Sequence, residues 1–175
     1  MSKAVMLSIR PKWCEKIANG EKTIEVRKTR PKLDTPFKCY IYCTLPKYPH
    51  EDFIVTDYPR PQFYGGGKVI GEFTCDRIDR LAPANDPYGI YDIDDDYVLQ
   101  TCLENGALWD YGHGAPLYGW HISDLRIYDA PKCLFEFWAE RLCRREPSVF
   151  GCGECCDCDK RAPQSWCYVE EMDNG

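Results

Sequence analysis

Apolar residues alternate with other residues along several short stretches of the chain, which is the pattern of β-strands with two distinct faces. In the first stretch, Val5, Leu7 and Ile9 share one face. The same reasoning predicts strands at 5–9, 22–28, 37–43, 68–81, 120–122, 125–128 and 165–169. Gly71 is a predicted bulge or bend, because a glycine inside a strand often marks one.

Three segments have a helical spacing of apolar residues instead. The first is predicted to begin at Pro11, which suits the first position of a helix, and to run to about Asn19, where Gly20 stops it. A second helix is predicted over 92–105, with acidic residues at its start and the next residue, a glycine, as its stop. A third is predicted over 135–143.

Strands outnumber helices, so the sequence predicts the α+β class: a small mixed β-barrel with a helix covering one end. The 175 residues are enough for one domain with a well-formed core. We therefore interpret 1–175 as a single domain with a loop insertion at about 45–66 and a cysteine-rich insert at about 143–160. The first helix would cover one mouth of the barrel and bring the start of the second strand to that rim.

Composition narrows the class of protein. Aromatic residues make up 14% and hydrophobic residues 44% of the chain, as in globular proteins. There is no apolar run of about 18 residues, and residues 1–8 enter a strand pattern without a signal-peptide core. We therefore expect a cytoplasmic protein that does not enter a membrane.

Charge is distributed unevenly. The net charge of −6 argues against general affinity for nucleic acid, yet residues 1–38 contain ten Lys or Arg and only four Asp or Glu. A basic face on an acidic body can bind a polyanion or a single phosphate at one place. A solvated surface without a ligand is the alternative.

The most informative segment is GEKTIEVR, from Gly20 to Arg27. It places Lys22, Glu25 and Arg27 at the end of the first helix and along the next strand. Alternation predicts that the two apolar residues of this strand face a core and that Glu25 and Arg27 share the other face. Lys22 has the opposite parity to Glu25, so it must be aimed from the turn if both are to share a site.

This segment resembles the G-x-K-x-x-E-x-R motif of the ASCH family, in the PUA-like barrel superfamily. The supporting segments are LSIRPKW at 7–13, GKVIGEF at 67–73, WHIS at 120–123 and APQSW at 162–166. The resemblance covers roughly residues 3–44, 67–82 and 117–170. It implies a cleft for RNA or a modified nucleotide, lined by the motif residues. A few family members are enzymes; one branch hydrolyses N4-acylated cytidine, and another is reported as ribonuclease-like.

The residues near this motif have the chemistry of a nucleotide site. Arg27 and Arg10 suit phosphate, because a planar guanidinium binds two oxygens at once. Trp13 could stack on a base. The predicted ligand-binding set is Ser8, Arg10, Lys12, Trp13, Lys22, Glu25, Arg27, Gln164 and Ser165. Core packing of Trp13, and a structural ion pair between Glu25 and Arg27, are the alternatives.

A hydrolase acting on a nucleoside or RNA is the second interpretation, with Lys22 and Glu25 as its acid–base pair. The acylcytidine-hydrolysing branch has a threonine nucleophile where this chain has Glu25, and Thr23 lies two residues too early to replace it. This departure favours a binding module over an enzyme. A third interpretation is a protein-interaction adaptor that uses the acidic surface and the loop 45–66. None of the three requires a cofactor.

The segment CGECCDC at 152–158 is the second local signal among the twelve cysteines. Its C-x-x-C spacing allows two thiolates of a tight turn to bind one tetrahedral ion, and Cys143 or Cys167 could complete the set. The sequence therefore predicts a structural zinc site formed by Cys152, Cys155, Cys158 and Cys167. A reduced insert without metal is the alternative.

Overall fold

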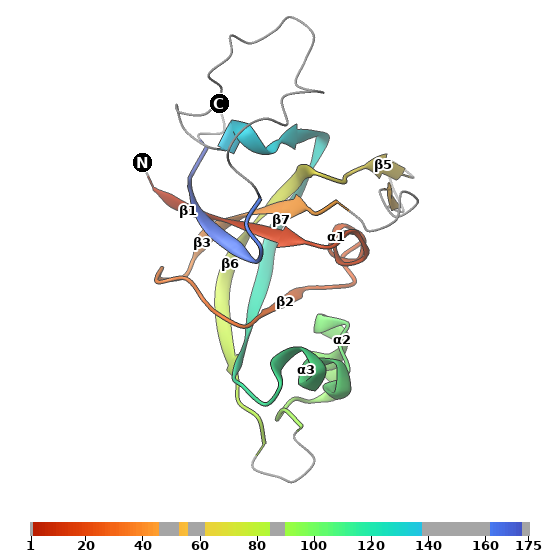
Figure 1. Cartoon of the computed structure of the whole chain (residues 1–175), viewed down its shortest axis with the longest axis vertical. Coiled ribbons are helices and arrows are strands. Elements are labelled where there is room, and N and C mark those ends of the chain that lie inside the picture. Colours follow the sequence, from red (N-terminus) through yellow and green to blue (C-terminus); the bar gives the residue numbers. More distant parts are fainter. Residues whose placement is uncertain (1, 46–52, 56–61, 85–89, 138–161, 173–175) are drawn as a thin grey trace, which may run out of the picture.

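The computed structural model describes residues 2–45, 53–55, 62–84, 90–137 and 162–172 (Figure 1). Its elements in chain order are β1 (Lys3–Ile9), α1 (Pro11–Ala18), β2 (Ile24–Arg27), β3 (Phe37–Cys43), β4 (Phe53–Val55), β5 (Gln62–Tyr64), β6 (Lys68–Leu81), α2 (Asp95–Thr101), α3 (Asn105–Gly112), β7 (Leu117–Cys133), a 3₁₀ turn η2 (Leu134–Phe137) and β8 (Trp166–Glu170).

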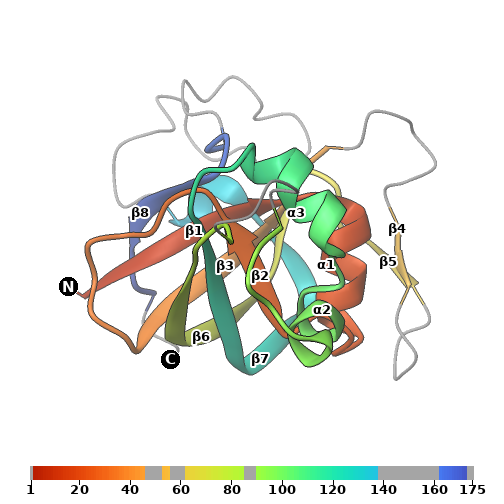
Figure 2. The same cartoon turned by 90° about the horizontal axis from the view of Figure 1, so that it is seen from below.

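Six strands form one mixed sheet in the order β2-β7-β6-β3-β1-β8. Only β1 and β3 are parallel; the other neighbouring pairs are antiparallel. The strands curl around a common interior (Figure 2), but β2 and β8 remain edge strands, so in the described residues no backbone ladder closes the sheet. The predicted α+β class is confirmed, and the barrel is an open one.

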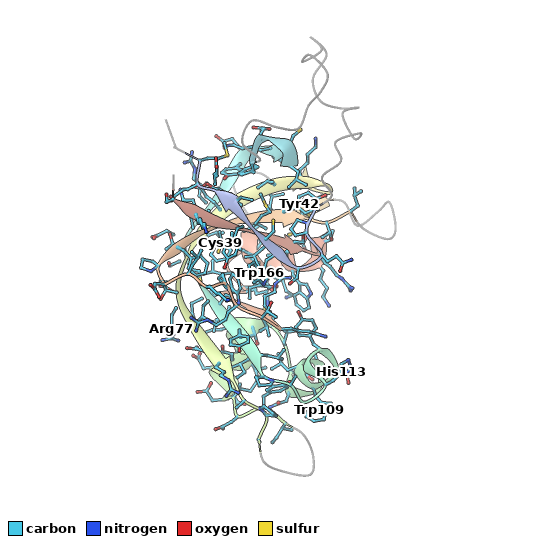
Figure 3. The ribbon with its side chains drawn as sticks, turned by 60° about the vertical axis from the view of Figure 1, so that its left-hand side comes forward. Cys39, Tyr42, Arg77, Trp109, His113 and Trp166 are labelled. Atoms are coloured by element: carbon cyan, nitrogen blue, oxygen red, sulfur yellow. The ribbon has the colours of Figure 1, made fainter. Side chains whose placement is uncertain are left out.

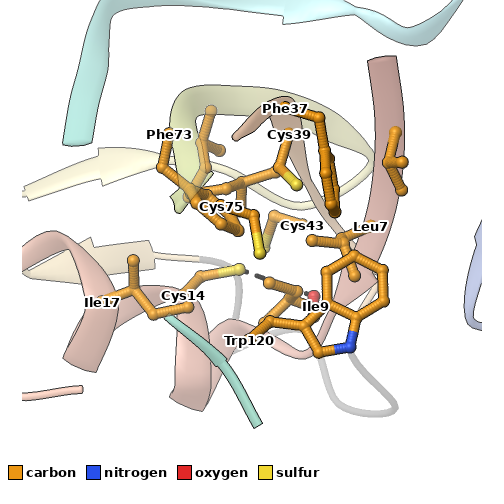
Figure 4. Packing of buried hydrophobic residues seen from close by; sticks show 13 residues of the cluster. Leu7, Ile9, Cys14, Ile17, Phe37, Cys39, Cys43, Phe73, Cys75 and Trp120 are labelled. Atoms are coloured by element: carbon orange, nitrogen blue, oxygen red, sulfur yellow. Dashed lines mark hydrogen bonds between the residues drawn. The ribbon is translucent and has the colours of Figure 1, made fainter. Parts of the chain in front are cut away.

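Apolar residues from β1, α1, β3, β6 and β7 fill this interior, which α1 covers at one end (Figure 4). This interior core consists of Val5, Leu7, Ile9, Cys14, Ile17, Phe37, Cys39, Ile41, Cys43, Ile70, Phe73, Cys75 and Trp120. The thiol of Cys14 donates to the carbonyl oxygen of Ile9 at 3.5 Å, which ties α1 to the end of β1. The predicted inward face of β1 is therefore confirmed.

The opposite face of β1 is buried as well. Ala4 and Met6 pack into a second core with Tyr128, Phe137 and Val169, contributed by β7, η2 and β8. Periodicity along β1 indicated only one buried face, because the residues that cover the other face lie far away in the sequence.

The helix predicted over 92–105 is in fact two helices. Asp94 caps α2 by accepting the backbone N–H three residues later, and α2 ends at Cys102, which has a left-handed φ of 54°. The chain then turns and begins α3. Gly106, expected to stop the helix, lies in the first turn of α3. The apolar spacing continues across the break, so the sequence pattern did not show where α2 ends.

The strands predicted at 120–122 and 125–128 are parts of one long strand, β7. Asp124, with φ 48°, lies between the two segments, so a local irregularity separated their patterns. The bend predicted at Gly71 is confirmed, since the β6–β7 register shifts beside it. A Cβ there would lie 2.5 Å from the backbone oxygen of Arg126, so only glycine allows this close approach.

The remaining predictions are tested in part. The loop insertion 45–66 contains a short antiparallel hairpin, β4 and β5, which lies beside α1 (Figure 2). The helix predicted over 135–143 begins as the 3₁₀ turn η2, and its remainder lies outside the described residues, as does the whole of the insert 143–160. Within the described part of the chain, no helix has the length and apolar character needed to cross a membrane.

Candidate functional site

The charged residues of β2 point toward the interior that the curled sheet encloses, not toward solvent. Glu25 pairs with Trp120, and Arg27 pairs with Tyr118, across β2 and β7. Directly paired residues share a face, and Trp120 belongs to the interior core. Val26 packs instead with residues of β6, β7 and α3. The prediction that Glu25 and Arg27 share one face, with Val26 toward a core on the other, is therefore confirmed. The charged face is nevertheless turned to the interior core, and the whole of β2 is buried.

Lys22, Glu25 and Arg27 form one buried charge cluster. Lys22 Nζ lies 3.4 Å from Glu25 Oε2, and Arg27 Nη2 lies 3.0 Å from Glu25 Oε1. Their side chains are only 1%, 8% and 8% exposed, respectively. Lys22 reaches Glu25 from the turn before β2, as its parity requires. Two cations thus share one carboxylate, and the cluster has an excess of one positive charge.

The end of α2 positions Lys22. Its ammonium group donates to the carbonyl oxygen of Thr101 at 2.6 Å and lies 5.1 Å from the centre of the Trp13 ring. The backbone N–H of Thr23 donates to Gln100 O at 2.9 Å, which holds the turn against the same helix end. The carbonyls at a helix C-terminus favour a cation. Nothing in the sequence pointed to Thr101, which lies 79 residues from Lys22.

Arg27 bridges the gap between the two edge strands, β2 and β8, which we call the seam. Its Nη2 donates to Ser8 O at 2.9 Å, and its Nη1 lies 3.4 Å from Ser165 O and 3.5 Å from Ser165 Oγ. Nearby, Trp166 Nε1 donates to Thr29 Oγ1 at 2.9 Å. Side chains therefore hold the seam where no backbone ladder runs.

Two buried N–H groups in this region lack an acceptor among the described residues. One is Nε of Arg27, and the other is Nε1 of Trp120, on the strand paired with Glu25. Buried donors are nearly always satisfied in folded proteins. The site therefore has hydrogen-bonding capacity for a group that presents acceptor atoms.

The other predicted ligand residues have varied surroundings. Ser8 Oγ donates to Pro163 O, so its hydroxyl is already used inside the protein. Lys12 Nζ lies 4.8 Å from the centre of the Trp13 ring, so two ammonium groups contact this one indole. The side chains of Arg10 and Gln164 are exposed, and neither has a partner in the described part of the chain.

The predicted zinc site stays a prediction. Cys152, Cys155 and Cys158 lie outside the described residues, whereas Cys167 is a partly buried thiol of β8. Among the residues that the structure describes, no group of three or more His, Cys, Asp or Glu side chains could hold a metal ion.

The interior thiols have a different character. Burial raises the pKa of Cys14 well above its ordinary value, with a further contribution from Cys43, and burial also raises the pKa of Cys39. Burial raises the pKa of Cys75 to about 12. These thiols are protonated and behave as small apolar groups of the core.

Solved structures resemble this one over nearly its whole length. The crystal structure of ASCH from Zymomonas mobilis superposes with a TM-score of 0.60 at 18% sequence identity and covers 96% of this chain and 88% of that chain. A variant of the same protein with a tyrosine replaced by phenylalanine superposes with a TM-score of 0.60 at 18% identity and covers 97% of this chain and 92% of that chain. For a serine-to-alanine variant, the TM-score is 0.59 and the identity 17%, with 96% of this chain and 89% of that chain covered. No protein-family model and no curated protein matches the chain.

Proposed function

We propose, on the premise that this chain has the fold of the ASCH proteins, that it is an RNA- or nucleotide-binding module whose charge cluster receives an anionic group of the ligand. The observation that carries this proposal is the excess positive charge of the cluster, where Lys22 and Arg27 share the single carboxylate of Glu25. Buried charge is costly unless it is compensated. A phosphate beside the cluster would supply the missing negative charge.

The donors around the cluster support the same ligand. The unpartnered Nε of Arg27 can donate to a phosphate oxygen or to a base acceptor. Arg10 and Lys12 are exposed near the start of α1 and would attract a polyanion over a longer range. Because Lys12 and Lys22 both contact the Trp13 ring, we assign Trp13 to positioning Lys22 rather than to base stacking.

A binding titration with conservative variants tests this proposal. We expect Lys22→Met and Arg27→Lys each to weaken binding of a short fluorescent oligoribonucleotide about tenfold and to flatten its salt dependence. Lys16→Met is the matched control, since Lys16 is a neighbouring lysine whose side chain is 32% exposed and pairs with Glu21 at the surface. Circular dichroism at the titration temperature verifies that each variant is folded. Unchanged affinity in both cluster variants would refute the proposal.

Hydrolysis of a nucleoside or RNA is a second candidate function, favoured by one contact. Lys22 Nζ and Glu25 Oε2 form an ion pair at 3.4 Å, which places a candidate acid and a candidate base in one buried site. Both oxygens of Glu25 are already paired, however, so no lone carboxylate oxygen is ready to activate water. Turnover of an acylated nucleoside or a labelled RNA that is abolished by Glu25→Gln would establish this function, and absence of turnover in the unmodified protein would exclude it for those substrates.

A further inference from the structure

The segment after β2 runs beside β8 and brings basic and aromatic residues together (Figure 2). Thr29 accepts the indole N–H of Trp166, and the backbone N–H of Lys32 donates to Tyr168 Oη at 2.8 Å. These two contacts lie on the same seam that Arg27 bridges. The seam therefore leads from the buried charge cluster to the surface.

A row of aromatic rings follows the seam. Trp120 is fully buried, Trp166 is partly buried, and Tyr168 is 39% exposed. The ring centres of Trp120 and Trp166 are 6.1 Å apart, and those of Trp166 and Tyr168 are 5.4 Å apart. The outer end of this row presents an aromatic surface to solvent, next to residues that contact Arg27.

Cations flank the outer end of the row. Lys3 Nζ lies 5.6 Å from the centre of the Tyr168 ring, and Arg30 and Lys32 are exposed in the segment that runs beside β8. Lys28 belongs to the same segment, but its Nζ lies 4.9 Å from the centre of the Tyr111 ring on α3. The side chains of Lys3, Arg30 and Lys32 form no ion pair with another residue of the described part. Their charges are therefore available to an external anion.

We propose that this surface is a subsite for single-stranded RNA, in which a base stacks on Tyr168 while the flanking phosphates contact Lys3, Arg30 and Lys32. Exposed aromatic rings interleaved with cations are the usual means of holding a single strand. The inference rests on the proposed function and deepens it, because it makes the ligand a strand of several nucleotides that extends along the seam from the charge cluster. A free nucleotide would fill only the cluster.

The test compares ligands of two lengths on matched variants. We expect Tyr168→Ala to weaken binding of a single-stranded oligoribonucleotide about tenfold, the typical value for one stacked base, and to leave binding of a nucleoside monophosphate unchanged. Tyr168→Phe keeps the ring and should retain affinity. Trp109→Ala is the control, because Trp109 is similarly exposed, at 38%, but lies on α3 at the far end of the molecule from Trp166 (Figure 3).

Two further measurements make the outcome decisive. Lys32→Ala and Arg30→Ala should each reduce the slope of log K against log salt by about 0.7, the value for one phosphate contact on a single strand. Ultraviolet crosslinking followed by mass spectrometry should place RNA on the peptide that contains Trp166 and Tyr168.

Each negative result has a distinct meaning. If Tyr168→Ala binds RNA normally while Arg27→Lys does not, the strand subsite is refuted and the proposed function stands. If Tyr168→Ala and both cluster variants, Lys22→Met and Arg27→Lys, leave affinity unchanged, both proposals fail. Equal affinity for double-stranded RNA, or RNA-independent capture of a protein partner that requires Tyr168, would also overturn the single-strand assignment.

Discussion

Replacing Glu25 by glutamine should destabilise the fold more than replacing Lys22 by methionine. Glu25 supplies the carboxylate for both cations of the cluster, at 3.4 Å and 3.0 Å. Without this charge, the ammonium of Lys22 and the guanidinium of Arg27 remain as two like charges, and both side chains are at most 8% exposed.

The contacts set the magnitude of each loss. Removing one partner of a buried ion pair costs about 3–5 kcal/mol, because the other charge stays buried. Glu25→Gln leaves two buried charges without their carboxylate partner but keeps an amide oxygen as acceptor, so we expect the free energy of unfolding to fall by about 4 kcal/mol. Lys22→Met leaves Glu25 paired with Arg27 and mainly loses the hydrogen bond to Thr101 O. We expect this loss to be about 2 kcal/mol.

Equilibrium urea unfolding, followed by circular dichroism, measures both losses if the m-values agree. The double variant Lys22→Met/Glu25→Gln completes a thermodynamic cycle, and we expect it to lose less than the sum of the two single losses by about 1 kcal/mol or more. The reasoning is refuted if Glu25→Gln costs no more than Lys22→Met, or if the two losses simply add.

Three other predictions concern the surroundings of the site. A Cβ on Gly119 would lie 1.9 Å from Tyr97 Oη, so Gly119→Ala should lower the melting temperature, at a cost of about 1–3 kcal/mol. Tyr97→Phe removes the hydroxyl that this Cβ would meet and should reduce that cost; an unchanged cost contradicts the explanation. Tyr128 Oη donates to Glu72 Oε2 at 2.6 Å in a buried position, so Tyr128→Phe should lose about 1.5–3 kcal/mol in urea unfolding, and no loss contradicts this. Burial raises the pKa of the Cys14 thiol above its ordinary value of 9.0, so this thiol loses its proton at a lower pH in the unfolded chain than in the folded one. The free energy of unfolding should therefore fall as pH rises above about 9, by up to about 1.4 kcal/mol per pH unit. Cys14→Ala should lessen this slope in unfolding measured at several pH values.

Helices and strands could be predicted from the sequence where the residues that begin, end or pattern them belong to the element itself or adjoin it. Pro11 and Gly20 mark the two ends of α1, and the long alternation of 68–81, with its bend at Gly71, marks β6. In both cases the local backbone preference and the tertiary structure agree, so the pattern was sufficient. The GEKTIEVR segment likewise showed which charged residues would meet, and the aim of Lys22 from the turn followed from parity.

The burial of the charged face of β2 could not be predicted from the sequence, because it depends on elements that lie far away along the chain. Alternation cannot tell which face of a strand meets the larger core when both faces are buried. Here Glu25 faces the interior beside Trp120, and α2 and α3 hide the apolar face. The contact of Thr101 with Lys22 was missed for the same reason, since the two residues meet only through the fold.

The bridge that Arg27 makes across the seam has a consequence for folding kinetics. Lys22 and Thr101 are 79 residues apart, and Arg27 and Ser165 are 138 residues apart. Contacts between such distant residues form late, because a long loop must be closed before they contribute. The contacts that hold Arg27 are therefore complete only when β8 has docked against β1. A partly folded chain with α1 and β2 in place would contain every residue of the motif without its geometry, so ligand binding would report that folding has finished.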